Sequence, residues 1–511
     1  MRNEPVAHDG TLAGLLAARV AHAPERAFLL FEPRRWSWAA FADEVARTAG
    51  LLAGGGVGRG DRVAALSANS DALVTLLFAA ARVGAIFVPL DPALPPAELR
   101  ARVAHAEPRA LAASEPCLAA AREAGAPWLF QLGDSGAPAP PGGGPDDACV
   151  MVYTSGTTAH PKGVLHTQRS VVLAGEAFVE RMRLSPDDRL LCILPLFHIN
   201  ALLYSLMGAV AAGASLVLAP RFSASQFWRL VAASGATEVN LLAALGSMLA
   251  RRPRSEFVAG HRLCKIYGAA IPPEVADVFQ RELGVPTIIE GYGMTEVPGV
   301  TSQPFAGPHK RGSMGPASRH PDPARQLAEL RVVDDSGRDL PDGETGELWV
   351  RTPLVMQGYF RDPEATAAAF RDGWFVTGDL VRRDADGHVS FVARKKDIIR
   401  RRGENISGAE LDRVLGLHPA VAEAAAIAVP SQLGEDDILA VVVTRPGAQL
   451  SAAELAAHCA QQLAAHKVPR YVAFVAELPH TPSHRVAKFQ LREDPTLLAR
   501  AVDLQRYHGG A

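Results

Sequence analysis

Hydroxyl-bearing residues and glycine gather in one short segment whose chemistry suits phosphate binding. The apolar run from Cys149 to Val152 predicts a strand, so the segment begins where that strand ends. Hydroxyl groups can donate hydrogen bonds to phosphate oxygens, small residues let backbone N–H groups approach, and Lys162 adds a positive charge. The predicted phosphate loop consists of Thr154, Ser155, Gly156, Thr157, Thr158, Ala159 and Lys162.

Two other interpretations of this segment must be weighed. A Walker phosphate loop requires the pattern GxxxxGK[ST], which fails because Pro161 stands where the pattern needs glycine. A Ser/Thr-rich surface turn has the same composition, and the segment alone does not exclude it. The choice therefore depends on what accompanies the loop elsewhere in the chain.

Five further segments follow the loop in order and extend the pattern over almost the whole chain. They are Pro195–His198, Tyr267–Ala270, Gly291–Glu296, Trp374–Asp379 and Gly403–Ile406. Together with the loop they resemble the motifs of the adenylate-forming superfamily, which includes acyl-CoA ligases, luciferases and peptide-synthetase adenylation domains. Each motif is modest alone, but six in the family's order are specific. The overall sequence is more similar to the crotonobetaine/carnitine–CoA ligase branch than to luciferases.

The resemblance implies a role for each segment. The implied adenylate-binding residues are Gly268, Ala269, Ala270, Gly291, Tyr292, Gly293, Met294, Thr295, Asp379 and Arg394. The implied acyl pocket contains Phe197, His198, Asn200 and Tyr204, the implied hinge is Lys396, and the implied coenzyme A residues are Arg401, Arg402, Gly403, Glu404 and Asn405. The implied catalytic residues are His198, Glu296, Arg485 and Lys488, with Glu296 also the metal ligand.

These roles agree with the chemistry of the residues, although a simpler interpretation exists for each. Glu296 offers hard oxygen ligands suited to Mg²⁺ on a triphosphate, and Asp379 can accept hydrogen bonds from two ribose hydroxyls. Alone, either carboxylate would more often be a helix cap or a solvated side chain. His198 lies in an apolar run, where a histidine is more often part of the core.

The resemblance also implies a reaction in two steps at one site. A carboxylic acid attacks the α-phosphorus of ATP to give an acyl-adenylate and pyrophosphate. The small domain then rotates about the hinge, and the thiol of coenzyme A displaces AMP. The implied ligands are therefore coenzyme A, an acyl-adenylate or AMP, ATP if the first step is retained, and Mg²⁺.

The sequence departs from the family at the lysine that serves the first step. This lysine belongs to a Thr-Pro-x-Gly-Lys setting, but here His484 replaces the glycine and Arg485 replaces the lysine. A planar guanidinium does not replace a compact ammonium, and misplacement by about 1 Å can cost about a hundredfold in rate. Lys488 lies three residues further along a segment expected to be strand-like, which directs it to the opposite face.

A second departure affects the same step. Ala159 stands where the family's loop has glycine, and a Cβ there costs about 1–2 kcal/mol at positive φ or blocks the phosphate. The ribose residues, the hinge and the coenzyme A hairpin are retained. We therefore expect mainly thioesterification, with a partner adenylating ligase supplying the acyl-adenylate. Such a division resembles the paired acyl-CoA ligases of platensimycin-type diterpenoid biosynthesis, and this chain is similar to their non-adenylating member.

Several alternatives remain. A complete ATP-dependent acyl-CoA synthetase that tolerates Arg485 is the main one, and a non-catalytic adenylate-binding module is another. A peptide-synthetase domain would need a carboxylate for its substrate's ammonium, which the segment Phe197–Asn200 lacks. Nothing specific favours a luciferase-like oxidase. Phe197, Tyr204, Phe227 and Trp228 lie among small residues, which favours a bulky hydrophobic acid.

Strands and helices alternate in the first part of the chain, which predicts a parallel sheet covered by helices. The fold class is α/β, with a large N-terminal domain of helix-covered β-sheets (1–395) and a small mobile C-terminal α+β domain (396–511) hinged near Lys396. Gly133–Asp147 is expected to be a mobile surface connection. The other predicted elements are helices at Thr11–His22, Asp71–Val83, from Gly408 and from Ser451 with a capping box to Glu454, and strands at Arg62–Leu66, Ala85–Leu90, Ala424–Val429 and Ile438–Val443.

Composition excludes several classes of partner. The 52 basic and 54 acidic residues give a net charge of −2, so no basic field is available for nucleic acid or a membrane surface. Leu190–Pro220 is uncharged, but Pro195 and other polar residues interrupt it, which favours strand, loop, buried helix and strand. Five scattered cysteines and an N-terminus without an apolar signal segment predict a cytoplasmic protein. The sequence allows a homo-oligomer without setting its order.

Overall fold

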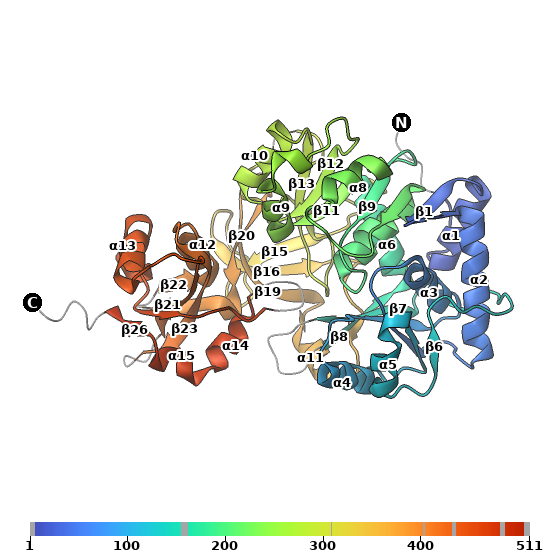
Figure 1. Ribbon diagram of the computed structural model, residues 1–511, viewed down its shortest axis with the longest axis horizontal. Coiled ribbons are helices and arrows are strands. Elements are labelled where there is room, and N and C mark those ends of the chain that lie inside the picture. The colour runs from blue at the N-terminus through green and yellow to red at the C-terminus, as the bar shows by residue number, and fades with distance from the viewer. Residues whose placement is uncertain are drawn as a thin grey trace, which may run out of the picture.

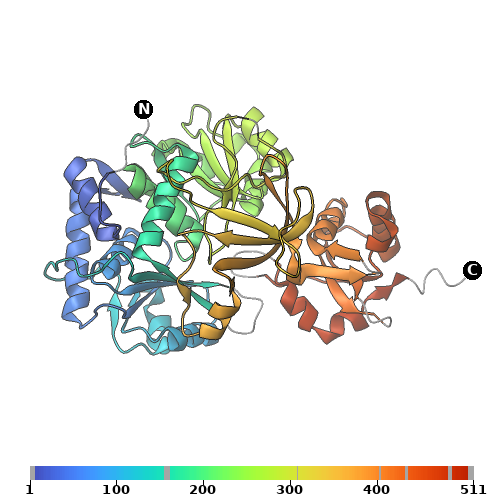
Figure 2. The same cartoon turned by 180° about the vertical axis from the view of Figure 1, so that it is seen from behind.

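The structure is a computed structural model that describes residues 6–154, 162–307, 309–401, 404–431, 436–480 and 486–504, apart from the side chains of Lys396, Glu404 and Asn405. Three sheets make up the part before residue 396, and a smaller group of strands and helices follows it. In Figure 1 this smaller group lies beyond β15, β16 and β19 at one end of the molecule, and Figure 2 shows the same arrangement from behind.

A seven-stranded sheet carries the strands that flank the predicted phosphate loop. Its order is β17-β8-β7-β4-β3-β5-β6, with parallel pairing from β7 through β6 and antiparallel pairing at β8 and β17. The predicted strand at Arg62–Leu66 is confirmed, and the predicted helix at Asp71–Val83 ends one residue earlier. The elements are β3 (Arg62–Leu66), α3 (Asp71–Arg82), β4 (Ile86–Leu90), α4 (Pro96–Ala106), β5 (Ala110–Ala113), α5 (Leu118–Ala124), β6 (Leu129–Gln131), β7 (Ala148–Thr154), β8 (Lys162–Thr167) and β17 (Gly358–Tyr359).

An eight-stranded sheet, ordered β14-β13-β12-β11-β9-β10-β1-β2, carries the second half of the site. The uncharged run after Leu190 forms strand, π-helix, α-helix and strand, as predicted. Among the described residues, no helix has both the length and the hydropathy to cross a membrane. The elements are β1 (Ala27–Phe31), β2 (Arg34–Ser37), β9 (Arg189–Cys192), η2 (Asn200–Leu206), α7 (Met207–Ala212), β10 (Ser215–Leu218), α8 (Phe227–Ser234), β11 (Glu238–Leu242), α9 (Ala243–Ala250), β12 (Lys265–Ala269), α10 (Pro273–Arg281), β13 (Thr287–Tyr292) and β14 (Thr301–Ser302).

Helices pack between and around these sheets because their apolar faces are buried. The side chain of Thr11 accepts a hydrogen bond from Gly14 N and caps α1, so the predicted helix begins one residue later than expected. Helix α6 contacts β7 and β8 on one side and η2 and α7 on the other, so it links the two large sheets. The bounds are α1 (Leu12–His22), α2 (Trp38–Gly54) and α6 (Gln168–Met182).

The connection Gly133–Asp147 contains no helix or strand, as expected, but it is held against the large domain. Gly136 N donates to Arg47 O at 3.1 Å, and Ala139 N donates to Ala46 O at 3.0 Å, both on α2. A mobile connection was expected, but these backbone hydrogen bonds hold the segment against α2. The composition of the segment does not indicate such hydrogen bonds.

A third sheet closes the large domain. It is mainly antiparallel, with the order β15-β16-β19-β18 and β20 paired to β19. The turn between β19 and β20 contains Asp384 and Gly387, and Gly387 has a φ of 79°. The elements are β15 (Glu329–Val333), β16 (Thr345–Arg351), α11 (Pro363–Ala368), β18 (Phe370–Arg371), β19 (Trp374–Arg383) and β20 (Val389–Arg394).

The C-terminal part has its own buried cores, separate from those of the large domain. Its helices pack on a four-stranded sheet ordered β23-β24-β25-β26, beside the hairpin β21–β22. The predicted capping box at Ser451 and Glu454 is confirmed. The elements are η4 (Lys395–Asp397), β21 (Ile398–Arg401), β22 (Glu404–Ser407), α12 (Gly408–Gly416), β23 (Val421–Pro430), β24 (Asp436–Thr444), α13 (Ala452–Gln462), β25 (Tyr471–Phe474), α14 (Lys488–Glu493), α15 (Pro495–Ala499) and β26 (Val502–Asp503).

Candidate functional site

The ends of the predicted phosphate loop lie side by side. Thr154 ends β7 and Lys162 begins β8, and the two residues are directly opposed in the antiparallel pair. The intervening loop therefore starts and ends at one edge of the seven-stranded sheet. Several predicted site residues lie outside the described residues, namely Ser155, Gly156, Thr157, Thr158, Ala159, Arg402, Gly403 and Arg485.

A lysine, a tyrosine and a glutamate meet next to this edge. Lys162 Nζ lies 4.6 Å from the centre of the Tyr359 ring, and the Tyr359 hydroxyl donates to Glu296 Oε1 at 2.9 Å. Burial raises the pKa of the Glu296 carboxyl, and the Tyr359 hydroxyl opposes that rise. Sequence analysis missed Tyr359, because no motif marks the two-residue strand β17 that brings it here.

Glu296 was predicted to hold Mg²⁺, and the arrangement around it fits that ion. Among the described residues there is no cluster of three or more metal-ligating side chains. Mg²⁺ typically takes one or two protein carboxylates and completes its shell with phosphate oxygens and water. A single buried carboxylate beside a phosphate loop satisfies this pattern, so the ion would be held largely by the nucleotide.

Asp379 forms the centre of the predicted ribose site. It lies on β19 directly opposite Arg394 on β20, and its carboxylate is 3% exposed. Tyr292 Oη donates to Asp379 Oδ2 at 2.5 Å, and Arg394 Nε lies 3.4 Å from Asp379 Oδ1. Burial and the Asp379 carboxylate raise the pKa of Tyr292, which keeps its hydroxyl a donor. The carboxylate is thus fixed in place by Tyr292 and Arg394.

The backbone around the predicted adenine segment is closely packed. A Cβ at Gly291 would lie 2.5 Å from the Tyr267 hydroxyl and 2.6 Å from Thr301 O, so only glycine fits. Ala270 has a φ of 55°, a left-handed conformation that L-residues adopt at a cost. Such strain concentrates at ligand sites, which agrees with the role predicted for Tyr267–Ala270.

Glu290 also belongs to this region, although sequence analysis missed it. Its Oε1 accepts a hydrogen bond from Ile271 N at 3.0 Å, one residue beyond the strained Ala270. Burial raises the pKa of Glu290 from 4.5 to about 7. The position is non-local, since the bond joins residues 19 apart in sequence.

The wild-type chain is expected to lose unfolding free energy as pH rises, and the Glu290→Gln variant is expected to lose less of it. Because folding raises this pKa from 4.5 to about 7, the folded state keeps a proton that the unfolded state releases. The wild-type chain should therefore lose up to about 3 kcal/mol of unfolding free energy between pH 4.5 and pH 8. Urea unfolding of both proteins at pH 5 and pH 8 checks this, and an equal loss in both would contradict it.

The residues predicted to form the acyl pocket contact a polar group that the motifs do not indicate. Asn240 Nδ2 donates to Asn200 Oδ1 at 2.8 Å and to Ser205 Oγ at 3.0 Å, which ties β11 to the π-helix η2. The Tyr204 ring is buried and stacks on Phe178, with ring centres 5.4 Å apart. Phe197 and His198 are half-buried, and their ring centres lie 4.7 Å apart. The Tyr204 phenol, which was predicted to lie in the acyl pocket, is therefore held in place by aromatic packing.

Two aromatic residues expected near this pocket pack elsewhere. Phe227 and Trp228 on α8 form a cluster in which Trp228 contacts Phe257, His261 and Phe279. The residues next to Phe227 and Trp228 in the sequence do not indicate which face of the sheet these two side chains cover.

Family models match both parts of the chain. Residues 16–360 match the model described as AMP-binding enzyme, and residues 410–485 match the AMP-binding enzyme C-terminal domain. The chain belongs to the AMP-binding enzyme family. The resemblance inferred from the six motifs is thereby confirmed.

Relatives and solved structures support this membership over nearly the full chain. A sulfoacetate–CoA ligase from Cupriavidus necator is 36% identical over 513 residues, covering 96% of this chain and 99% of the relative. A crotonobetaine/carnitine–CoA ligase from Salmonella paratyphi A is 29% identical, covering 92% and 96%. The structure of o-succinylbenzoate CoA synthetase (MenE) from Bacillus subtilis, in complex with its acyl-adenylate intermediate, matches with a TM-score of 0.85 at 26% identity, covering 96% of this chain and 98% of that chain. The predicted fold class is confirmed.

In this AMP-binding enzyme, Lys488 lies differently from expectation. It begins helix α14 rather than continuing a strand, and its Nζ lies 2.6 Å from Asp412 Oδ2. Helix α14 begins at Lys488 because Leu491, three residues further along, is apolar and is buried in the small domain. Lys488 is thus held within the C-terminal part by a partly buried ion pair.

The coenzyme A prediction also needs a correction at Arg401. The Arg401 side chain is 7% exposed, donates to Val468 O at 2.8 Å and pairs with Asp437 at 3.1 Å. These contacts give it a structural position inside the small domain. Its neighbour Arg400 on β21 is exposed instead, which makes Arg400 the better candidate for an anionic ligand. Strand alternation separates the two side chains.

The remaining predictions lie at the junction and the hairpin. The backbone of Lys396 lies in η4 between β20 and β21, at the predicted hinge position. The backbone of Glu404 and Asn405 pairs with β21 in the predicted hairpin. The domain boundary and the hinge remain predictions.

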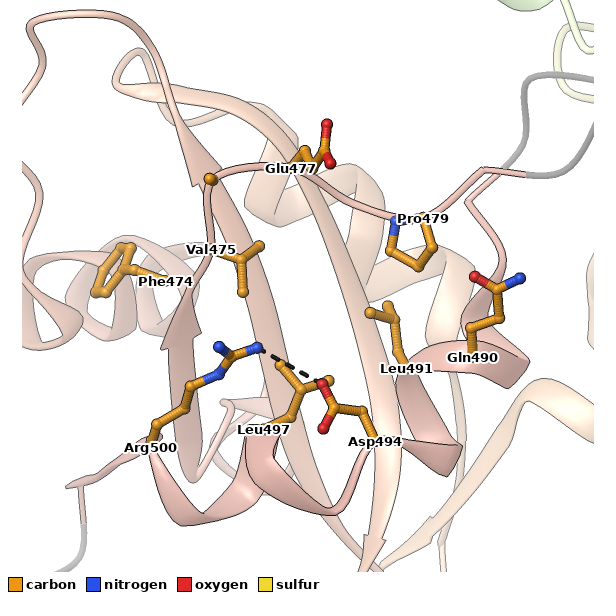
Figure 3. A pocket seen from close by; sticks show the side chains of 10 residues that line it. Phe474, Val475, Glu477, Pro479, Gln490, Leu491, Asp494, Leu497 and Arg500 are labelled. Carbon is orange, nitrogen blue, oxygen red and sulfur yellow. Dashed lines mark ion pairs between the residues drawn. The ribbon is translucent and has the colours of Figure 1, made fainter.

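A hollow of about 470 Å³ on the small domain is separate from these residues (Figure 3). Val475, Leu491 and Leu497 line its apolar side, and Asp494 and Arg500 form an ion pair at 3.6 Å across its edge. None of its lining residues belongs to the predicted adenylate, acyl or coenzyme A sets.

Proposed function

We propose that this AMP-binding enzyme is an acyl-CoA ligase that makes an acyl-CoA thioester from an acyl-adenylate, and that it performs mainly the thioesterification half of the reaction. The observation that carries the second part is Arg485 at the position of the family's adenylating lysine. Ala159 in place of the loop glycine adds to it. Both changes affect the step that uses ATP.

The contacts of Lys488 support this proposal. Its ammonium is paired with Asp412 at 2.6 Å, and both side chains are largely shielded from solvent. For Lys488 to replace the missing lysine, this ion pair would have to break and leave the largely shielded Asp412 carboxylate without its charge partner, with only the hydrogen bond from Ala426 N. Breaking a buried pair costs several kcal/mol, so Lys488 is a poor substitute.

The retained residues account for the second half-reaction. Asp379, fixed by Tyr292 and Arg394, binds the ribose of the acyl-adenylate. Lys162 is positioned to bind its phosphate. The thiol of coenzyme A releases its proton to water, its sulfur attacks the acyl carbon, the C–S bond forms, and the bond from that carbon to the AMP phosphate oxygen breaks. AMP leaves with the negative charge.

His198 and the small domain complete this scheme. We place His198 beside the acyl group, where the half-buried Phe197–Asn200 segment adjoins η2. The hairpin β21–β22 and exposed Arg400 would bind coenzyme A after the small domain rotates about Lys396. A partner adenylating ligase would supply the acyl-adenylate, and the non-adenylating member of the platensimycin-type pairs remains the proposed parallel.

A complete ATP-dependent acyl-CoA synthetase is the second candidate. The contacts that favour it are those of Glu296 with Tyr359 and of Tyr359 with Lys162, which keep a magnesium ligand beside the phosphate loop. An enzyme that never used a triphosphate would not require that ligand. The relatives' names differ in their acid, from sulfoacetate to crotonobetaine, so they do not specify the acid.

Thioester formation tests the proposal. The purified chain is incubated with coenzyme A and synthetic acyl-adenylates of several acids, and acyl-CoA is quantified by mass spectrometry. Acyl-CoA is expected to form without ATP, with AMP released in equal amount. No acyl-CoA from any adenylate would contradict the proposed function.

A further inference from the structure

Arg181, near the end of α6, is a buried cation with unused hydrogen-bond donors. Its residue is 7% exposed. Nη2 donates to Gly299 O at 3.1 Å and to Ser318 Oγ at 3.2 Å. The Tyr204 and Tyr267 hydroxyls also interact with the guanidinium, but Nε and Nη1 are buried and make no hydrogen bond of good geometry to the described residues. These two nitrogens carry three of the five guanidinium N–H groups.

Aromatic rings, not carboxylates, surround this guanidinium. Its Cζ lies 5.3 Å from the centre of the Tyr267 ring, 5.5 Å from that of Tyr204 and 6.0 Å from that of Phe178. No carboxylate within the described part of the chain forms an ion pair with it. Ring faces attract a cation, but a buried charge is normally also paired with an opposite charge. The surroundings of Arg181 therefore lack an anion.

The guanidinium lies next to the proposed site, on the acyl side. Gly299 follows the Gly291–Glu296 motif, and the Tyr204 hydroxyl lies 3.2 Å from where a Cβ on Gly293 would be. Tyr204 also belongs to the predicted acyl pocket. Asp379 and Lys162 are proposed to bind the ribose and the phosphate, and both lie elsewhere in the site. Arg181 therefore remains to bind the acyl part of the ligand.

Other groups near η2 are polar as well. Asn240 Oδ1 is buried without a hydrogen-bond partner among the described residues, while its Nδ2 binds Asn200 and Ser205. A purely hydrocarbon chain would leave such groups unsatisfied, at a cost of about 1–3 kcal/mol each in free energy of binding or folding. An acid with polar atoms beyond its reacting carboxyl avoids that cost.

We propose that Arg181 is a specificity residue that binds a second anionic group, a carboxylate or a sulfonate, at the far end of the acid. This inference rests on the proposed function and names its substrate class. It replaces the earlier expectation of a bulky hydrophobic acid. The anion would accept hydrogen bonds from Nε or Nη1 and supply the charge that the protein does not.

Binding of stable acyl-adenylate analogues tests the proposal. Acyl-sulfamoyl adenosines are prepared in sets of three that differ only at the far end, which carries a carboxylate, a sulfonate or a methyl group, on chains of two to five carbons. Isothermal titration gives their Kd values for the wild-type chain and for Arg181→Gln. At one or more chain lengths the wild type is expected to prefer an anionic end over methyl by about 10- to 100-fold. The carboxylate and sulfonate arms show which anion is preferred.

The methyl-ended analogues separate specificity from folding. Arg181→Gln should bind them as the wild type does, within about threefold, while losing its preference for the anionic end. Arg181→Lys should retain part of that preference. Arg331→Gln, which removes an arginine stacked on Trp349 and Trp374 away from the site, is the matched control and should keep it.

Two results would overturn the inference. One is a wild-type chain that binds anionic and methyl-ended analogues equally at every length. The other is an Arg181→Gln variant that loses affinity for the anionic and the methyl-ended analogues equally, which would make Arg181 a structural or phosphate-binding residue. Absence of binding for every analogue would instead refute the acyl-adenylate site, and with it the proposed function.

Discussion

Arg485→Lys combined with Ala159→Gly is expected to raise acid-dependent pyrophosphate exchange by about 100- to 1,000-fold. A lysine ammonium can bridge the attacking carboxylate and the α-phosphate, where a guanidinium is too broad and too rigid. Glycine at 159 removes a Cβ from the phosphate loop. Thioester formation from a supplied acyl-adenylate uses neither feature and should change by less than about threefold. Exchange of radiolabelled pyrophosphate into ATP measures the first quantity, and acyl-CoA by mass spectrometry measures the second.

The matched control for this gain is Arg500→Lys. Arg500 belongs to the same small domain, and within the described part of the chain its side chain makes only a 3.6 Å pair with Asp494, so the same change there should leave both rates as they are. The single variants Arg485→Lys and Ala159→Gly, measured separately, show how much of the gain in pyrophosphate exchange comes from each substitution. If the double variant gains nothing across a wide panel of acids, including anionic ones, the assignment of the two departures is wrong.

Asp379→Asn should weaken the binding of an acyl-sulfamoyl adenosine by about 100-fold. The carboxylate is buried, accepts the Tyr292 hydroxyl at 2.5 Å and lies 3.4 Å from Arg394 Nε. An amide has one acceptor oxygen instead of two and leaves Arg394 without its charge partner. Hydrogen bonds to a charged group contribute about 1.5–3 kcal/mol each, and two ribose hydroxyls are at stake. Isothermal titration measures the change in Kd.

Two further variants make this result specific. Tyr292→Phe removes the hydroxyl that orients the carboxylate but keeps the carboxylate, so affinity should fall by less than about tenfold. Asp386→Asn removes a carboxylate from an exposed pair with Lys310 and should bind normally. Thermal unfolding of each variant shows whether it is folded. Normal affinity in folded Asp379→Asn would exclude Asp379 from the ribose site.

The sequence predicted elements well wherever the deciding contacts are local. The capping box at Ser451 depends on Glu454 three residues away, and the strand at Arg62–Leu66 depends on an uninterrupted apolar run. The segment at Lys488 was expected to be strand-like, but it begins α14, in which Leu491 is buried in the core of the small domain. That contact is tertiary, and no short pattern encodes it.

The residues near the predicted site that no motif marks share one property. Tyr359, Glu290 and Arg181 each act through a partner distant in sequence: Glu296, Ile271 and Gly299. Motifs identify residues that are proposed to touch a common ligand, such as Asp379 and Glu296. They do not identify the residues that hold those groups in place or fill the space beside them, because these depend on how two sheets meet across α6.

The division between the two half-reactions is tested most directly by measuring both on one preparation of the wild-type chain with one acid. One arm follows pyrophosphate exchange with ATP, Mg²⁺ and the acid, and the other follows acyl-CoA formed from the corresponding adenylate and coenzyme A. We predict acyl-CoA formation at least about 100-fold faster than exchange, in line with the loss expected for one transition-state contact. Comparable rates in the two arms would contradict this account and identify a complete acyl-CoA synthetase.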